Sequence, residues 1–199
     1  MLPTIETWDQ QLFLLFNGYH NHFFDTLMYW ITYKYTWYPL YLVLIVVIIG
    51  KYQWKGLIIC LTMVLAVSIS DQITSGFMKP YFGRLRPCHD PRIQELVHVV
   101  AGCGGKYGFA SSHSSTTFAL ATTLWLTLRI WSRYFWGVFL WAALIAYSRI
   151  YVGVHYPLDI FIGAWVGMVV GGTFYLIYLK IARRLFHQTT SQKGDYLEE

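Results

Sequence analysis

The chain has 199 residues, of which 56% are hydrophobic and only 13% are charged, and its formal net charge is +5. A soluble domain usually carries about 25% charged residues, so this composition excludes an ordinary soluble protein. The mean hydropathy of +0.41 and the many Trp, Tyr and Phe residues, which are typical of interfacial aromatic belts, indicate an integral membrane protein. We expect its partner to be the lipid bilayer and not a nucleic acid.

Long apolar segments predict an all-α fold, a polytopic membrane bundle of five or six transmembrane helices, since one span needs about 20 mostly apolar residues. We expect residues 4–16 to form a short amphipathic helix in the headgroup region and residues 23–33 to form an interfacial or re-entrant helix. The spans are expected at residues 36–50, 56–78, 113–131, 133–152 and 156–181. Residues 1–187 would then be one integral-membrane domain, and residues 188–199 a polar tail. No basic region precedes an apolar core at the N-terminus, so we expect no cleavable signal peptide.

Polar residues form three clusters at the ends of these spans. The first closes the second span, the second opens the third span, and the last brackets the turn between the fourth and fifth spans. With five spans, all three clusters fall on one face of the membrane. They are Lys79-x6-Arg86-Pro87, Ser111-Ser112-His113 and Ser148-Arg149-x5-His155-x3-Asp159.

Three of these residues, Lys79, Arg86 and Arg149, are cations, which suit a phosphate group. Positioned Lys and Arg side chains stabilise the charge that spreads over the phosphoryl oxygens in the transition state. Ser111 and Ser112 lie where the third span begins, so free backbone N–H groups and the helix dipole add to an anion site. The alternative is that each cation only contacts lipid headgroups, as Lys and Arg often do at helix ends.

The two histidines permit a division of labour. His155 and Asp159 are four residues apart at the start of the last span, so both lie on one helical face. The carboxylate can hold one ring nitrogen protonated and leave the other free to attack phosphorus. His113 can then act as the general acid for the leaving oxygen.

Other phosphate chemistries fit the sequence poorly. Cys88 and Cys103 have no Arg six positions further on, as a Cys-x5-Arg phosphatase loop requires. Residues 102–106 resemble a P-loop fragment but lack its first Gly, and Tyr107 replaces the required Ser or Thr. No metal-binding motif is present, so we expect neither a metal ion nor a cofactor.

The three clusters resemble the signature motifs of the type 2 phosphatidic acid phosphatase (PAP2) superfamily, over residues 71–159. The resemblance implies that His155 forms a phosphohistidine, that Asp159 orients it and that His113 is the acid. It also implies phosphate binding by Lys79, Arg86, Ser111, Ser112 (through its backbone N–H) and Arg149. One position departs from the family's Pro-Ser-Gly-His pattern, because Ser112 adds a Cβ where the family has Gly.

The expected function is hydrolysis of a lipid phosphate monoester or diphosphate. The resemblance allows undecaprenyl diphosphate, phosphatidylglycerol phosphate, phosphatidic acid or lipid A as substrate. Transfer of the phosphate to another lipid, and binding or transport of an anionic headgroup without catalysis, are the alternatives. With the clustered cations set aside, most basic residues lie at the opposite ends of the spans, so the clusters are expected to face outward from a bacterial inner membrane.

Three further features complete the predictions. Cys88 and Cys103 flank the loop 88–110, the expected wall or lid of the pocket, and are equally compatible with a disulfide and with free thiols. Asp71 lies within the second span and is expected to support the site. A glycine repeat at every fourth position of the last span predicts close helix packing inside the subunit, at Gly163, Gly167 and Gly171.

Overall fold

The computed structural model describes residues 3–128 and 136–195, with side chains described as far as residue 184. These residues form helices and contain no β-strand, so the predicted all-α class is confirmed. The elements are α1 Pro3–Gly18, α2 His22–Thr32, the 3-10 helix Lys34–Trp37, α3 Tyr38–Tyr52, α4 Trp54–Asp71, the π-helix Gln72–Met78, α5 Lys79–Phe82, 3-10 turns at Pro87–His89 and Gln94–Leu96, α6 Ser112–Leu128, α7 Gly137–Tyr151 and α8 Pro157–Asp195.

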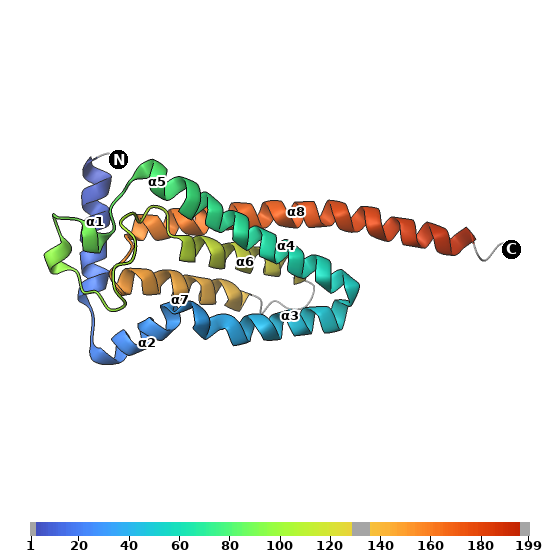
Figure 1. Cartoon of the computed structure of the whole chain (residues 1–199), viewed down its shortest axis with the longest axis horizontal. Helices are drawn as coiled ribbons and strands as arrows, with labels where there is room; N and C mark the ends of the chain where they lie inside the picture. The colour runs from blue at the N-terminus through green and yellow to red at the C-terminus, as the bar shows by residue number, and fades with distance from the viewer. Residues whose placement is uncertain (1–2, 129–135, 196–199) are drawn as a thin grey trace.

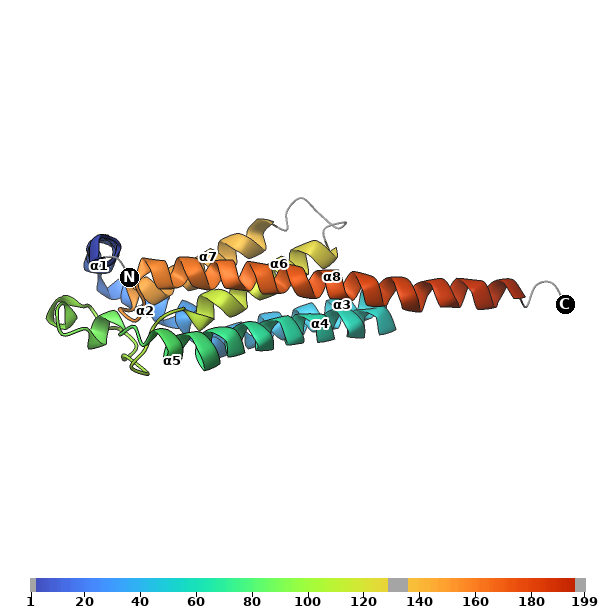
Figure 2. The same cartoon turned by 90° about the horizontal axis from the view of Figure 1, so that it is seen from above.

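The long helices run side by side, and α1 lies across one end of the bundle (Figures 1 and 2). Helix α8 starts at that end and continues beyond the other helices to Asp195, through most of the segment predicted as a polar tail. Among the described residues, three helical stretches are long and apolar enough to cross a membrane, at Lys34–Tyr52, Trp54–Phe82 and Pro157–Arg184, and α7 is a shorter apolar helix. The predicted spans 113–131 and 133–152 extend into residues outside those described, so the count of five spans stays a prediction.

The second span does not end at Lys79, as the sequence suggested. Helix α4 passes into a π-helical turn in which the N–H of Lys79 bonds to the carbonyl of Thr74. Pro80 therefore sits in the first turn of a new helical segment, where a missing N–H costs nothing. The helix continues to Phe82 and stops at Gly83, whose φ of 57° favours glycine. Because no break separates α4, the π-helical turn and α5, Lys79 lies inside a continuous helical stretch, close to its C-terminal end.

Helix α1 has an inverted polarity compared with a surface helix of a soluble protein: polar residues lie on its buried side and large apolar residues are exposed. Its buried positions follow i, i+4, i+8 and include two polar residues, Asp9 and Asn17, on either side of Phe13. Its exposed residues include five large apolar side chains, Ile5, Trp8, Leu12, Leu15 and Phe16, together with the polar residues Thr4, Thr7 and Gln11. This pattern suits a helix that faces lipid on one side and a polar protein interior on the other.

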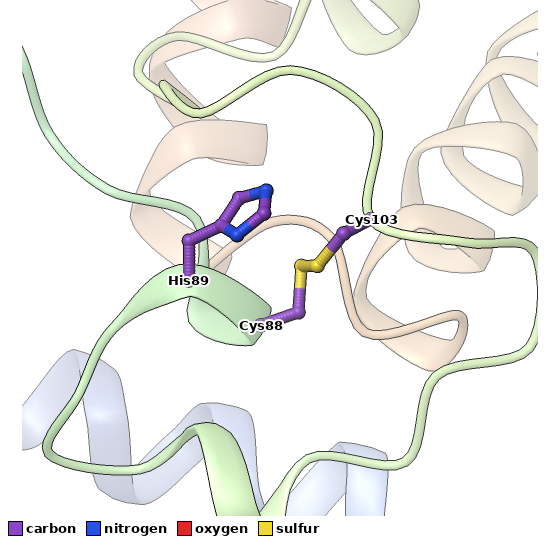
Figure 3. Close-up of side chains that lie close together, drawn as sticks. All are labelled: Cys88, His89 and Cys103. Carbon is purple, nitrogen blue, oxygen red and sulfur yellow. A yellow bond between two sulfur atoms is a disulfide. The ribbon is translucent and has the colours of Figure 1, made fainter.

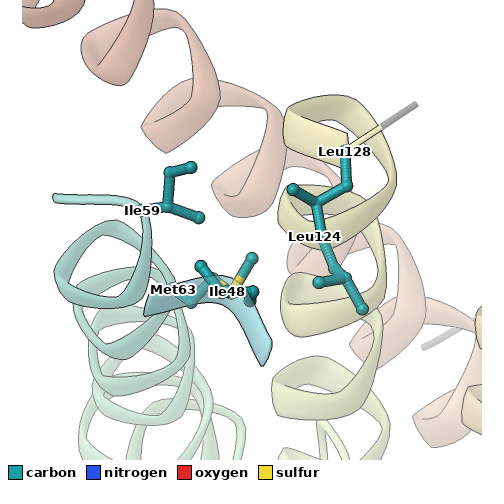
Figure 4. Packing of buried hydrophobic residues seen from close by; sticks show 5 residues of the cluster. All are labelled: Ile48, Ile59, Met63, Leu124 and Leu128. Carbon is teal, nitrogen blue, oxygen red and sulfur yellow. The ribbon is translucent and has the colours of Figure 1, made fainter. Parts of the chain in front are cut away.

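Helices α6 and α8 approach each other most closely along the glycine repeat. A Cβ added at Gly163 would lie 2.5 Å from the carbonyl oxygen of Ser111, and one at Gly171 would lie 2.7 Å from that of Ala119. The predicted intramolecular packing role is therefore confirmed. An apolar cluster lies farther along the bundle (Figure 4), formed by Ile48, Ile59, Met63, Leu124 and Leu128.

We expect Gly167→Ala to destabilise the protein by about 1–3 kcal/mol, as overpacking usually does, because its Cβ would collide with the carbonyl oxygen of Ser115. Thermal unfolding in detergent measures the effect. Gly172→Ala is the matched control, since a Cβ there meets no atom within 4 Å. Equal unfolding temperatures for the two variants would contradict the proposed close contact.

Candidate active site

The turn between α7 and α8 places His155 in the protein interior. The backbone N–H groups of Val154 and His155 both donate to the carbonyl of Arg149, at 3.1 and 3.3 Å. Gly153 has a φ of 83°, and a Cβ there would lie 2.5 Å from the carbonyl oxygen of His98. The chain therefore folds back tightly after Arg149, and the side chain of His155 is only 1% exposed.

Asp159 lies beside His155, as their i, i+4 spacing predicted. The Nδ1 atom of His155 is 3.3 Å from Oδ2 of Asp159, which also accepts a hydrogen bond from the backbone N–H of Tyr156 at 3.1 Å. The carbonyl of Asp159 accepts the N–H of Ser111 at 3.0 Å. This last bond joins the start of α6 to the first turn of α8.

The remaining cluster residues converge on the same place. Lys79 Nζ donates to Ser112 Oγ at 2.8 Å, and Arg149 Nη1 donates to Thr32 Oγ1 at 2.6 Å. Electrostatic interactions link His113 with His155 and with three cations, Arg149, Lys79 and Arg86. The structure therefore brings together all eight site residues that the sequence predicted.

Two buried donors in this group have no hydrogen-bond partner among the described residues. They are Oγ of Ser111, on the turn before α6, and Nε of Arg149, near the end of α7. A buried donor without a partner costs about 1–3 kcal/mol. An anion bound between these two elements would satisfy both donors.

The surroundings of His155 favour its neutral form. Burial has the largest effect, and the nearby Arg149 and Arg86 add to it, so the pKa of His155 lies well below its ordinary value. A neutral imidazole with Nδ1 turned towards Asp159 leaves Nε2 as its free nitrogen. This is the protonation state that a nucleophilic histidine requires.

The loop 83–111 forms a wall of the site. The N–H of Arg86 donates to the carbonyl of Lys106 at 3.1 Å, and the N–H of Gly108 donates to that of Arg84 at 2.9 Å. A Cβ on Gly108 would lie 3.0 Å from Oδ2 of Asp159 and 3.5 Å from Nδ1 of His155. Any larger residue at Gly108 would therefore push against the pair.

Cys88 and Cys103 form a disulfide in this loop (Figure 3), with a Cα–Cα distance of 6.0 Å. The sequence had left a disulfide and free thiols equally open. Both cysteines lie close to Arg86. Cys88 follows Arg86 by two residues, and Cys103 precedes Gly104, against which the guanidinium of Arg86 lies. The disulfide thus fastens both sides of the segment that holds Arg86.

The sequence prediction gave neither Arg84 nor Asp9 a role in this site. Arg84 Nη1 donates to Oδ1 of Asp159 at 2.7 Å, and its Nη2 donates to Oδ2 of Asp9 at 2.6 Å. Burial lowers the pKa of Arg84, but the two carboxylates outweigh burial and raise it overall. The proximity of Arg84 to Arg86 in the first cluster was a signal for its inclusion, whereas Asp9 lies on a distant helix and gave none.

One cavity adjoins the site, and a second cavity shares lining residues with it. The first has a volume of about 220 Å³ and lies against the start of α6; its lining includes Thr32, Asp71, Ser112 and His113. The second has a volume of about 290 Å³, lies between α3, α4 and α6, and is lined mainly by apolar residues. Both cavities are lined in part by Tyr41, Thr116 and Thr117.

The family model of the PAP2 superfamily matches residues 55–183, which include all three clusters. The chain belongs to the PAP2 superfamily. The predicted family and the predicted class of enzyme, a membrane phosphatase that hydrolyses phosphate esters, are confirmed.

Similar proteins support this PAP2 membership along nearly the whole chain. A lipid A 4'-phosphatase of Bacteroides thetaiotaomicron is 36% identical over 193 residues, which cover 95% of this chain and 85% of that protein. A lipid A 4'-phosphatase of Porphyromonas gingivalis is 39% identical over 175 residues, covering 86% and 73%. The crystal structure of Aquifex aeolicus LpxE superposes with a TM-score of 0.59 at 26% identity, covering 85% of this chain and 93% of that one.

Proposed function

We propose that this PAP2 phosphatase removes a phosphate monoester from a lipid A-type glycolipid. The observation that carries the proposal is the similarity to two lipid A 4'-phosphatases, which extends over 95% and 86% of this chain. It therefore extends well beyond the three motifs. The site geometry supports the chemistry, and the two cavities support an amphiphilic substrate.

In the first step, Nε2 of His155 attacks phosphorus and the bond to the leaving lipid oxygen breaks. His113 donates a proton to that oxygen, which leaves as an alcohol. Asp159 accepts the Nδ1–H of His155 and stabilises the positive charge that develops on the ring. The product of this step is a phosphohistidine.

In the second step, water attacks phosphorus and the bond to Nε2 breaks. His113, now without its proton, takes one from the attacking water, so that both histidines return to their starting states. Inorganic phosphate is released. Each step leaves the phosphorus with the same number of bonds that it had before.

The phosphate oxygens would bind to Lys79, Arg86 and Arg149 and to the start of α6. The unpartnered donors, Ser111 Oγ and Arg149 Nε, would each gain an acceptor. The first amides of α6, including that of Ser112, have no acceptor within the helix and favour an anion there. Lys79 already donates to Ser112 Oγ, so the extra side chain at this position helps to fix the lysine.

The lipid tails would follow the cavities away from the phosphate. The cavity beside His113 has polar lining residues such as Asp71, and the neighbouring cavity between α3 and α4 has mainly apolar ones. The helices around this cavity would face the bilayer with their outer sides. Burying an acyl chain in such an apolar environment is favourable by about 0.8 kcal/mol for each CH₂. A lipid could therefore keep its tails in an apolar environment while its phosphate contacts His155.

We further propose that the site faces outward from a bacterial inner membrane. Lys51 and Lys55 lie at the opposite end of the bundle, in the last turn of α3 and the first turn of α4. Lys180, Arg183 and Arg184 lie in the distal part of α8. Basic residues of this kind favour the cytoplasmic side, which supports an outward-facing site.

A comparative turnover assay tests the substrate. Phosphate release would be measured from lipid A, undecaprenyl diphosphate, phosphatidylglycerol phosphate and phosphatidic acid at equal surface concentration in mixed micelles. We expect the highest kcat/KM with lipid A, with loss of one phosphate from each molecule. A higher kcat/KM with any of the other three would overturn the substrate assignment.

The same assay separates the two alternatives from hydrolysis. Loss of substrate phosphate to a second lipid without free phosphate would identify a phosphotransferase. Binding of lipid A with no chemical change would identify a non-catalytic carrier. Either result would overturn the proposed hydrolysis.

A further inference from the structure

A chain of three charged side chains connects α1 with the candidate nucleophile. Arg84 lies in the middle and binds Asp159 with one terminal nitrogen and Asp9 with the other, at 2.7 and 2.6 Å. The side chains of Arg84, Asp9 and Asp159 are 10%, 6% and 0% exposed. So little exposure leaves these charges weakly screened by solvent.

The geometry fixes which oxygen of Asp159 faces His155. Arg84 takes Oδ1, so Oδ2 remains for Nδ1 of His155 and for the N–H of Tyr156. The guanidinium of Arg84 also lies over the ring of Tyr156, at 4.2 Å from its centroid. Arg84 is thus held from two sides while it holds the carboxylate.

Asp9 contacts both Arg84 and the helix that carries Asp159. Its Oδ2 accepts from Arg84, and its Oδ1 accepts the backbone N–H of Leu158 at 2.9 Å. Leu158 is in the first turn of α8, where backbone N–H groups lack acceptors within the helix. One carboxylate on α1 therefore aligns the arginine and the start of α8 together.

We propose that Arg84 and Asp9 are positioning residues for the reaction, which fix the orientation of Asp159 and balance the charge beside His155. The inference rests on the proposed role of His155 as nucleophile, but not on the identity of the lipid. Neither residue has a hydrogen bond to His155, so both orient it through Asp159.

The charge balance follows from the groups that face His155. These are Lys79 on α5, Arg84 and Arg86 on the loop, His113 on α6, Arg149 on α7 and Asp159 on α8. All except Asp159 are cations or can become one, and Asp9 adds its negative charge from α1 through Arg84. Removing Arg84 would therefore favour the imidazolium form of His155, and removing the charge of Asp9 would disfavour it.

The two substitutions should therefore move the pH dependence of activity in opposite directions. The acidic limb of kcat/KM reports groups that must lose a proton in the free enzyme or the substrate. We expect Arg84→Gln to move this limb to higher pH and Asp9→Asn to move it to lower pH, each by about 0.5 unit. The titration of the substrate phosphate is the same for all variants, so it cannot itself produce a difference between their limbs.

The experiment uses the full chain in detergent with phosphatidic acid or an aryl phosphate, whichever the wild type hydrolyses. Arg84→Gln combined with Asp9→Asn should return the limb towards the wild-type position. Arg84→Lys keeps the charge but lacks the planar fork that reaches both carboxylates, so kcat should fall about 10-fold without a shift. Glu6→Gln is the matched control on α1, since Glu6 pairs with the exposed Arg92, and its limb should not move.

The position of the limb does not depend on how much of a variant folds, because misfolding lowers only the amplitude. Unmoved limbs, or shifts in the same direction, in Arg84→Gln and Asp9→Asn would overturn the inference. His155→Ala is measured in parallel. Activity in that variant would refute the proposed nucleophile, whereas an inactive His155→Ala with unmoved limbs would refute the positioning role alone.

Discussion

His155→Ala is expected to lower phosphate release by at least about 1,000-fold, in line with the loss of other catalytic nucleophiles. The substitution removes the only nitrogen that the proposed mechanism uses to attack phosphorus. It leaves Asp159 bound to Arg84 and to the N–H of Tyr156, so the surrounding fold should persist. Phosphate release from a lipid phosphate in mixed micelles measures the effect.

His22→Ala is the control for this prediction, because His22 is exposed at the start of α2. It should retain nearly full activity. Both variants should elute as folded protein in detergent. Substantial turnover by the His155 variant would exclude the phosphohistidine route.

His113→Ala should produce a loss that depends on the leaving group. With a lipid phosphate, whose alkoxide is a poor leaving group, we expect a loss of about 100- to 10,000-fold, the usual contribution of a general acid. With an aryl phosphate, whose leaving group needs no proton, formation of the phosphohistidine should fall far less. Single-turnover measurements of leaving-group release with both substrates give the two ratios.

Comparison with His155→Ala makes this test specific. Loss of the nucleophile should lower the rates with both substrates alike, since the attacking atom is missing in either case. In His113→Ala the phosphoenzyme should also accumulate, because the base for the attacking water is lost. Equal losses with lipid and aryl substrates in the His113 variant would argue that His113 only binds phosphate.

The sequence was most informative where the chemistry depends on local spacing. The i, i+4 relation of His155 and Asp159 and the four-residue repeat from Gly163 to Gly171 both follow from helix geometry, and both were found as predicted. Residues at span ends could also be assigned to one end of the bundle by counting spans. This is why the three motifs were expected to meet.

The failures have physical causes of two kinds. The end of the second span was misplaced because a π-helical turn before Pro80 removes the conflict that usually ends a helix at proline. The pairing of Asp9 with Arg84 was missed because it joins positions 75 residues apart, and only tertiary packing brings them together. The pairing of Cys88 with Cys103 likewise depended on how the loop folds.

Some predictions depend on surroundings that a single chain does not include. The outward orientation follows from basic residues and requires accessibility measurements in the native membrane. The division at residue 187 and the count of five spans also stay predictions. Assignment of the substrate depends on turnover, because phosphate-binding residues recognise the group that all four candidate lipids share.

The proposed role of Asp9 couples enzyme turnover to the anchoring of α1 in the membrane. The outer residues of α1, such as Trp8 and Leu12, are exposed and apolar, while Asp9 on its inner side holds Arg84. A shift of this helix in depth or tilt would move Asp9 and, through Arg84, the carboxylate beside the reacting imidazole. Bilayer thickness and detergent choice should therefore influence the catalytic rate even when the phosphate group itself remains equally accessible.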